Sequence, residues 1–218
     1  MTFHETGTAA PIVRTLPGPA AYMCGLTWDG TLLWHSDQDA GKIFAIDPAD
    51  GTVERELACA RVRADLSYDG AQLLQVGGHP KRVVLVDPST GRQNGEKRVL
   101  PASGRLTGIE LAAEGLWMCL REPTVVQLRN YTTMEIEREF AVEGDSPSGL
   151  TYADGMVIHG DIGDGLLRAT SAQTGEPLGS VRVPGRPTGL TWDGEYLWYC
   201  DFPARAFRCL RLGALLTR

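Results

Sequence analysis

The sequence predicts an all-β protein folded as a five-bladed β-propeller, with four antiparallel strands in each blade. Three observations carry this prediction: a repeat of about forty residues, turn motifs at fixed places within each repeat, and complementary strands at the two ends of the chain. The repeat starts at positions 25, 65, 108, 149 and 189, which gives steps of 40, 43, 41 and 40 residues. A fixed period near this length, with strand-like rather than helical patterning, is typical of propellers.

The first repeat shows how a blade should form. Residues 25–30 read Gly-Leu-Thr-Trp-Asp-Gly, and the copy at 189–194 is identical. The Asp-Gly pair is a strong hairpin signal because glycine reaches positive φ without strain. Further strands are expected at 32–36, 42–46 and 52–57, with an Asp-Pro-x-x-Gly turn at 47–51. The charged run Glu54, Arg55 and Glu56 is typical of an edge strand that faces water.

The two ends of the chain should complete one blade together. The fifth repeat supplies three strands, at 190–192, 196–200 and 206–211, and the sequence then ends soon after. Residues 12–19 resemble residues 180–187, which form the outer strand of the fourth repeat. We therefore expect residues 1–218 to form a single propeller domain, in which the N-terminal strand closes the C-terminal blade.

Composition limits the classes of function. A hydrophobic content of 43% is ordinary for a globular protein. A net charge of −6 argues against nucleic acid or an anionic membrane as the partner, because both require a basic surface. The sequence shows no signal peptide, no apolar segment of spanning length and no disulfide framework among its 5 cysteines, so a cytoplasmic location is expected.

Long, variable loops gather at one end of the predicted ring, called here the upper face, where the first strand of each repeat begins. Variable loops on a rigid scaffold usually carry function, so the upper mouth of the central channel is the expected site. The second strands end at this face with His35 and Asp37 in the first repeat, and with His159 and Asp161 in the fourth. Asp201 is the equivalent aspartate of the fifth repeat. These five are the candidate catalytic residues.

Imidazole and carboxylate groups that converge on one cavity could act as general base and acid. They could also supply nitrogen and oxygen ligands to a divalent metal ion as a cofactor. A structural interpretation stands beside both. An aspartate at the end of a strand often caps the following turn, and a histidine between two blades can satisfy a neighbouring backbone group.

Four further residues are candidates for substrate binding. Asp65 stands where the other repeats have glycine, and Glu110 stands where the others have Thr or Ser, so both carboxylates should lie near the propeller axis. A buried charge there needs a partner or water. Arg121, on an upper loop, could pair with these acids or bind an anionic substrate, and Tyr199 takes the place of the two histidines in the fifth repeat.

The motif Gly-Leu-Thr-Trp-Asp-Gly, followed by Leu-Trp and by Ile-Asp-Pro-x-x-Gly, resembles the repeat of the NHL/YncE-like propeller superfamily. That superfamily includes virginiamycin B lyase, the gluconolactonase family and the five-bladed glutamine cyclotransferases. The resemblance covers nearly the whole chain and implies the propeller fold. In virginiamycin B lyase the functional acid follows a Leu-Trp pair by three residues. Asp37 and Asp201 have that spacing here, and Asp161 aligns with them.

The chain departs from two other patterns of this superfamily. Gluconolactonase-type enzymes place metal ligands just before the repeat glycine, and the corresponding residues here are Cys24, Thr107, Ser148 and Thr188. Glutamine cyclotransferases carry a Phe-Thr-Gln-Gly-Leu segment, which this sequence lacks. The second histidine of the lyase pattern is also missing, since Asp39, Gly163 and Pro203 stand in its place.

Three functions compete on this evidence. The first is a small-molecule enzyme that acts at the upper mouth by acid–base or metal-assisted chemistry of the lyase, cyclase or hydrolase class. The second is a non-catalytic propeller that binds a small molecule in the same channel, and the third is a protein-interaction scaffold. The His and Asp pairs favour the first two, because a scaffold should instead expose a broad patch on one face. The expected partner is therefore a small-molecule ligand or substrate.

Overall fold

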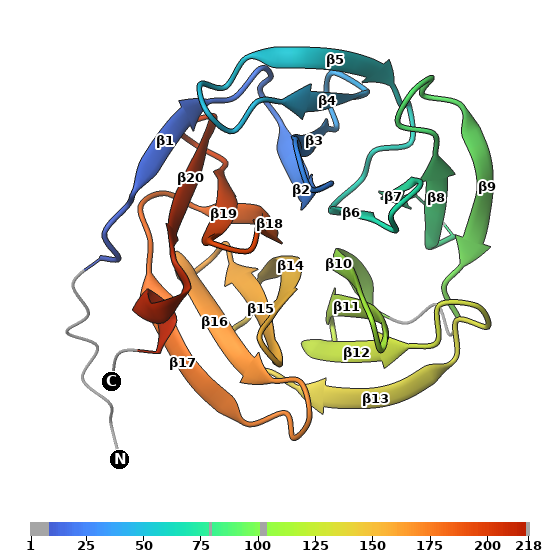
Figure 1. The fold of residues 1–218 in the computed structure, drawn as a ribbon. Helices are drawn as coiled ribbons and strands as arrows, with labels where there is room; N and C mark the ends of the chain where they lie inside the picture. Colours follow the sequence, from blue (N-terminus) through green and yellow to red (C-terminus); the bar gives the residue numbers. More distant parts are fainter. Residues whose placement is uncertain (1–8, 79, 101–103, 217–218) are drawn as a thin grey trace.

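The computed structural model describes residues 9–78, 80–100 and 104–216, and it forms a ring of five four-stranded antiparallel sheets (Figure 1). Four blades are continuous in sequence, and their strands run outward from the axis in chain order. Blade one contains β2 (Met23–Trp28), β3 (Leu33–Asp37), β4 (Lys42–Ile46) and β5 (Val53–Ala58); blade two contains β6 (Leu66–Tyr68), β7 (Leu73–Gly77), β8 (Arg82–Val86) and β9 (Gln93–Arg98). Blade three contains β10 (Arg105–Ala112), β11 (Gly115–Arg121), β12 (Val125–Arg129) and β13 (Ile136–Ala141); blade four contains β14 (Pro147–Ala153), β15 (Met156–Asp161), β16 (Leu166–Ser171) and β17 (Pro177–Arg182). The predicted five-bladed β-propeller is confirmed.

The fifth blade joins the two ends of the chain. Its inner strands are β18 (Pro187–Trp192), β19 (Tyr196–Asp201) and β20 (Ala206–Arg211), and its outer strand is β1 (Arg14–Pro17). The antiparallel register places Arg14 opposite Cys209 and Pro17 opposite Ala206. The closure expected from the sequence is therefore present, and Figure 1 shows β1 lying along β20 at the rim.

Hydrophobic side chains fill the spaces between neighbouring blades. One core cluster, for example, combines Trp34 and Ile43 of blade one with Leu73 and Val84 of blade two. The indole N–H of Trp34 donates to Oδ2 of Asp29, the turn aspartate of the same hairpin, at 2.6 Å. Burial of these rings removes much apolar surface from water, so the tryptophans of the repeat stabilise contacts between blades.

One short helical segment departs from the all-β pattern. A 3₁₀ helix, η1 (Leu212–Leu215), follows β20 and packs against β16 and β17. Leu212 and Leu215 are buried there, which explains why the chain turns back onto blade four instead of leaving the surface. Within the described ranges, no helix is long and apolar enough to cross a membrane.

The inner strands approach one another closely at the axis. A Cβ atom on Gly25 would lie 2.5 Å from the backbone nitrogen of Leu66 in the next blade, and one on Gly189 would lie 2.5 Å from the backbone of Gly25. Side chains at these positions would therefore push the blades apart. Asp65 stands at the fifth such position, and it is the one member of this set that carries a side chain.

Candidate functional site

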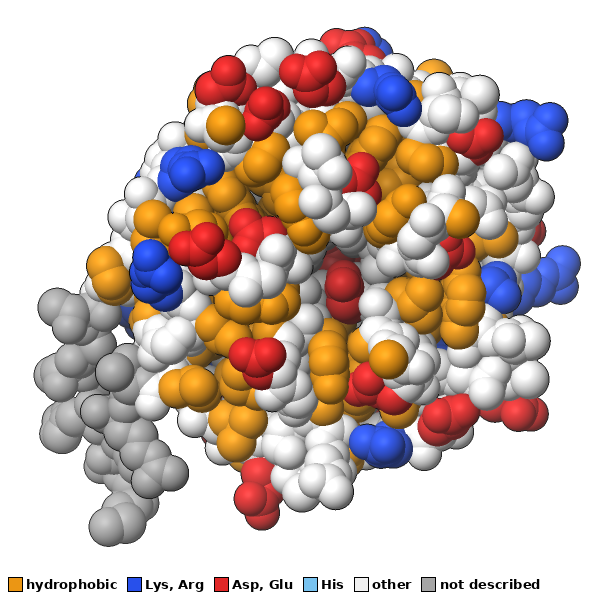
Figure 2. All heavy atoms as spheres, viewed as in Figure 1, with side chains coloured by type: hydrophobic (Ala, Val, Ile, Leu, Met, Phe, Trp, Pro, Cys, Tyr) orange, Lys and Arg blue, Asp and Glu red, His pale blue; other side chains and the backbone are white. Residues whose placement is uncertain are grey.

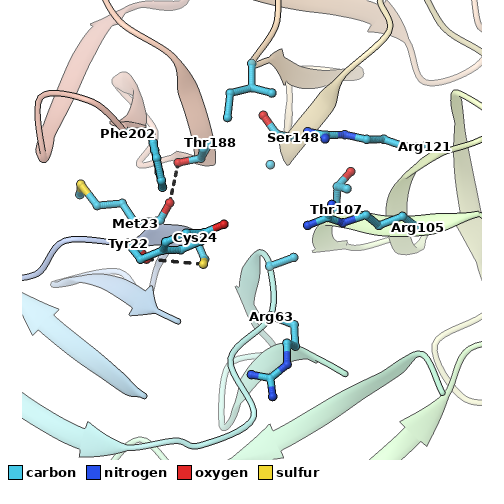
Figure 3. A pocket seen from close by; sticks show the side chains of 13 residues that line it. Tyr22, Met23, Cys24, Arg63, Arg105, Thr107, Arg121, Ser148, Thr188 and Phe202 are labelled. Atoms are coloured by element: carbon cyan, nitrogen blue, oxygen red, sulfur yellow. Dashed lines mark hydrogen bonds between the residues drawn. The ribbon is translucent and has the colours of Figure 1, made fainter. Parts of the chain in front are cut away.

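A cavity of about 240 Å³ lies at the upper mouth of the channel, where the inner strands begin (Figure 3). All five blades contribute to its lining. Blade one supplies Tyr22, and blade two supplies Arg63; blade three supplies Arg105, blade four Ser148 and blade five Phe202. The cavity is therefore at the end of the ring that the loop lengths indicated.

Two arginines of blade three dominate its charge. Arg105 begins β10 and Arg121 ends β11, and the two residues are register partners. Figure 3 shows both guanidinium groups extending into the cavity, whereas Arg63 lies at its edge and turns away. Nε of Arg121 donates to the carbonyl oxygen of Pro147 at 2.8 Å, which holds the side chain against blade four. Burial and the neighbouring Arg105 lower the pKa of Arg121.

These arginines have no acidic partner among the residues that the structure describes. No carboxylate lies within ion-pair distance of Arg63, Arg105 or Arg121 in those ranges. Two guanidinium groups on adjacent strands repel each other, and an anion between them would remove that repulsion. Among the described residues, the cavity lining thus contains three arginines and no carboxylate, in a chain whose net charge is −6.

The floor of the cavity is polar but uncharged. It is formed by one equivalent residue from each of four inner strands: Cys24, Thr107, Ser148 and Thr188. Oγ of Ser148 donates to the carbonyl of Pro187 at 2.7 Å, and Oγ1 of Thr188 donates to that of Met23 at 2.9 Å. Burial raises the pKa of the Cys24 thiol to about 12, so it stays protonated at neutral pH. These hydroxyls tie neighbouring blades together and keep lone pairs free to accept hydrogen bonds.

An apolar wall faces the arginines. The rings of Tyr22 and Phe202 meet edge to face, with centroids 5.0 Å apart and planes at 85°. Met23 lies beside them, and Ile162 adds apolar surface from blade four. Figure 3 shows this wall on the side of blades one and five, across the cavity from the guanidinium groups.

The two candidate histidines lie between blades and do not line this cavity. Both side chains are fully buried. Nδ1 of His35 is 2.9 Å from the carbonyl oxygen of Gly25, and its ring packs edge-on against Phe207 at 5.2 Å. Nε2 of His159 is 3.2 Å from the carbonyl oxygen of Glu143. Burial lowers the pKa of each imidazole to about 4, so both are neutral at pH 7.

Asp37 and Asp161 bind backbone N–H groups at the ends of their strands. The two carboxylate oxygens of Asp37 accept from the N–H of Tyr22 at 2.6 Å and from that of Ala40 at 2.7 Å. Oδ1 of Asp161 accepts from Gly163 at 3.0 Å and from Asp164 at 3.1 Å. These are the contacts of turn-capping aspartates, the structural interpretation that the sequence left open.

Asp201 is held by a side chain of its own blade. Its Oδ2 accepts from Nε of Arg208 at 2.8 Å, and the carboxylate is buried. None of the five candidate catalytic residues lines the upper cavity. The structure does not bring these imidazole and carboxylate groups together in the upper cavity, because the second strands direct them into blade interfaces and turns.

The four candidate substrate-binding residues divide between the cavity, the axis and a blade interface. Arg121 lines the cavity. The hydroxyl of Tyr199 instead donates to the carbonyl oxygen of Pro184 at 3.0 Å, and the residue is buried between blades four and five. Asp65 and Glu110 are absent from the cavity lining and belong to the channel.

Asp65 sits on the axis, where its carboxylate accepts hydrogen bonds from three other blades. The donors are the N–H groups of Leu26 at 3.3 Å, Ile109 at 3.2 Å and Leu150 at 2.8 Å. Burial raises the pKa of Asp65 well above its ordinary value, while these bonds oppose that shift. Burial and the nearby charge of Asp65 raise the pKa of Glu110 in the same direction. The channel acid Asp65 thus has backbone N–H groups as its partners. The upper arginine expected as its partner, Arg121, instead donates to the carbonyl oxygen of Pro147.

The candidate site residues chosen from the sequence included neither the apolar wall nor Arg105. The wall residues precede or follow strands, where no repeat pattern marks them. The floor residues share one repeat position, directly before the repeat start. This shared position is the sequence feature by which they could have been identified. For a metal ion, the described ranges bring together no group of three or more His, Cys, Asp or Glu side chains.

Comparison with known proteins defines the chain as a β-propeller. No family model and no curated protein matches the sequence. Among solved structures, the glutaminyl cyclase of Myxococcus xanthus is similar with a TM-score of 0.79 and 13% identity, over 93% of this chain and 95% of that one. The β-propeller domain of Cps50 (Swd1) from Myceliophteria thermophila is similar with a TM-score of 0.58 and 11% identity, over 92% of this chain and 98% of that domain. At such identities the likeness establishes the fold alone.

Proposed function

We propose that this propeller binds a small anionic molecule with an aromatic or otherwise apolar part in the cavity at its upper mouth. One observation carries the proposal: Arg105 and Arg121 are register partners that point into the same cavity, opposite the wall formed by Tyr22 and Phe202. The sequence already favoured a small-molecule site at this end of the ring. The positions of the two arginines add that the ligand carries a negative charge.

The chemistry of guanidinium supports an anion as the ligand. Arginine offers several N–H donors in a planar fork that matches a carboxylate or a phosphate, and such charge-assisted bonds are stronger than neutral ones. An anion between Arg105 and Arg121 would also offset their mutual repulsion. The hydroxyl oxygens of Ser148 and Thr188 could accept hydrogen bonds from a polar group on the ligand.

The size and the wall of the cavity support a compact ligand. Its volume of about 240 Å³ is below the roughly 300–1,000 Å³ of typical drug-sized sites. The half-buried rings of Tyr22 and Phe202 offer a face on which a small ring or chain can pack. A simple aromatic acid has both features that the cavity offers, so benzoate is a suitable probe.

Benzoate and its neutral isostere benzamide test this proposal by titration calorimetry at low salt. Benzoate should bind and benzamide should not, and added salt should weaken binding because exposed charges are screened. Arg105→Gln should weaken benzoate binding by about tenfold or more, since a charge-assisted bond contributes roughly 1.5–3 kcal/mol. Arg92→Gln, at an exposed position on another face, is the matched control and should bind normally. Equal binding of the two probes, or full binding by Arg105→Gln, would contradict the proposal.

Catalysis of the lyase, cyclase or hydrolase class is a second candidate function. The likeness to a glutaminyl cyclase favours the cyclase among these three. A peptide with an N-terminal glutamine would test it: mass spectrometry should show loss of ammonia, and Arg105→Gln should slow the reaction if the upper cavity holds the substrate. Parallel assays with EDTA and with added divalent ions would test the metal expected from the sequence. No turnover above that of heat-denatured protein would reject the cyclase.

A further inference from the structure

The lower half of the channel carries a second polar ring, separate from the upper cavity. Its members stand two residues after each repeat start, one per blade: Thr27, Ser67, Glu110, Thr151 and Thr191. The four hydroxyl residues are at most 1% exposed, whereas Glu110 is partly exposed. The ring therefore combines one carboxylate with four buried hydroxyl side chains.

Alternate residues of a strand share one face, so these side chains lie on the same face of the inner strands as the residues at the repeat starts, among them Asp65. The carboxylate of Asp65 is on the axis, so the side chain of Ser67 lies on the same face one step below it. Two contacts agree with this placement: Oγ of Ser67 accepts from the N–H of Leu111 at 3.0 Å and donates to Oε2 of Glu110 at 3.4 Å. Figure 2 shows an acidic side chain in the hollow at the centre of the ring.

One buried oxygen atom of the ring lacks a hydrogen-bond partner among the described residues. Oγ1 of Thr151 is buried and has no hydrogen-bond partner in the described parts of the chain. The carboxylate of Glu110 has one long hydrogen bond, from Ser67. Neither Glu110 nor Asp65 has a lysine or arginine within ion-pair distance among the described residues. Two carboxyl groups thus share the channel without a cation to balance them, a costly arrangement.

We propose that this lower ring binds a hard metal cation such as Ca²⁺, with Glu110 as the charged ligand and the hydroxyl oxygens of Ser67 and Thr151 as neutral ligands. Hard cations prefer carboxylate, hydroxyl, carbonyl and water oxygens, and the ring offers oxygen ligands only. A cation would use the free oxygen of Thr151 and would also offset the negative charge of both channel acids. A water molecule could do only the first.

Thermal unfolding of the full chain tests the site after chelation and dialysis. Ca²⁺ should raise the melting temperature of the wild type, because a ligand that binds only the folded state stabilises it. Mg²⁺, Na⁺ and K⁺ should be compared at equal ionic strength with choline chloride, which has no hard cation. Glu110→Gln should abolish the shift and, in chelator, should be at least as stable as the wild type. Glu54→Gln, an exposed substitution on an outer strand, should keep the full shift.

Titration calorimetry gives a second readout that does not depend on unfolding. The wild type should bind one Ca²⁺ per chain, Thr151→Val should bind it at least about tenfold more weakly, and Glu110→Gln should show no heat of binding. The proposal fails if no metal cation exceeds the choline control in the melting experiment. It also fails if Glu110→Gln binds the cation as tightly as the wild type. Glu110 would then not be a ligand of the cation, and the hydroxyl ring would be a site for water alone.

Discussion

Asp65 and Leu150 lie 85 positions apart in the sequence and meet on the propeller axis, where the N–H of Leu150 donates to Oδ2 of Asp65 at 2.8 Å. The same carboxylate accepts from Leu26 and Ile109, so one side chain of blade two contacts the inner strands of three other blades. The inner strand of each blade presents an unpaired edge to the channel. Asp65 satisfies N–H groups of three of these edges at once.

Asp65→Gly should destabilise the protein, although it restores the residue found at this position in the other repeats. The substitution leaves three buried N–H groups without an acceptor, and each such group costs about 1–3 kcal/mol. We expect urea unfolding to show a loss of about 3 kcal/mol or more. Asp65→Asn should lose less, because its remaining oxygen still accepts. If Asp65→Gly were as stable as the wild type, water would be replacing the carboxylate. The axial hydrogen bonds would then make no net contribution to the free energy of unfolding.

Closure of the ring by β1 should depend on Leu16. Leu16 is 5% exposed, and its strand pairs with β20, whereas Val13 is 49% exposed. Leu16→Ala should therefore destabilise the protein by about 2–5 kcal/mol, as for other buried leucines. Val13→Ala, in the same N-terminal segment, should change the stability little. Calorimetric melting of both variants checks this, and equal melting temperatures would show that β1 contributes little to closure.

Asp161 separates the structural from the catalytic interpretation of the strand-end aspartates. Its Oδ1 caps the turn at Gly163 and Asp164, and asparagine keeps an oxygen at that place. Asp161→Asn should preserve both stability and benzoate binding, whereas Asp161→Ala should lose about 1–2 kcal/mol, as capping residues do. Loss of benzoate binding in a stable Asp161→Asn would instead return this residue to the functional site.

The fold could be predicted from the sequence because similar strand and turn patterns recur in the five repeats. The Asp29–Gly30 and Asp193–Gly194 turns fix hairpins, and the charged fourth strand marks an outer edge. Pairing of residues 12–19 with the last blade followed from their likeness to another outer strand. Two details of the fold could not be predicted from the sequence. In four blades the inner strand begins two or three residues before the repeat start, as at Met23 in blade one, and η1 follows the last strand; no turn motif in the sequence marks either feature.

The site was harder to predict because side-chain direction depends on register. A register shift between Met23 and Gly25 turns the start of the inner strand, so that Cys24 and its equivalents line the cavity. The second strands pair without such a shift, and His35 consequently points into the interface with blade five. Alignment of repeats showed which residues are equivalent. It carried no information on whether an equivalent position faces the channel or a neighbouring blade.

The buried histidines should make the protein sensitive to mild acid. His35 and His159 have pKa values of about 4 in the folded protein, against an ordinary 6.5 in the unfolded chain. As the pH falls below about 6.5, these histidines therefore bind protons in the unfolded chain but not in the folded state. The free energy of unfolding consequently decreases between about pH 6.5 and about pH 4. The shift corresponds to on the order of 3 kcal/mol for each histidine. Asp65 and Glu110, whose pKa values are raised, act in the opposite direction.

Matched variants isolate the histidine contribution from that of the channel acids. His35→Asn places an amide nitrogen near Nδ1, and His159→Gln places one near Nε2, so each can donate to the carbonyl that the imidazole contacts. Neither amide titrates in this range. Urea unfolding at pH 7 and at pH 4.5 should show a smaller loss of stability in each variant than in the wild type, and the smallest loss in the double variant. An identical loss in all four proteins would mean that the histidines are protonated in the folded state, and that their burial does not lower their pKa values.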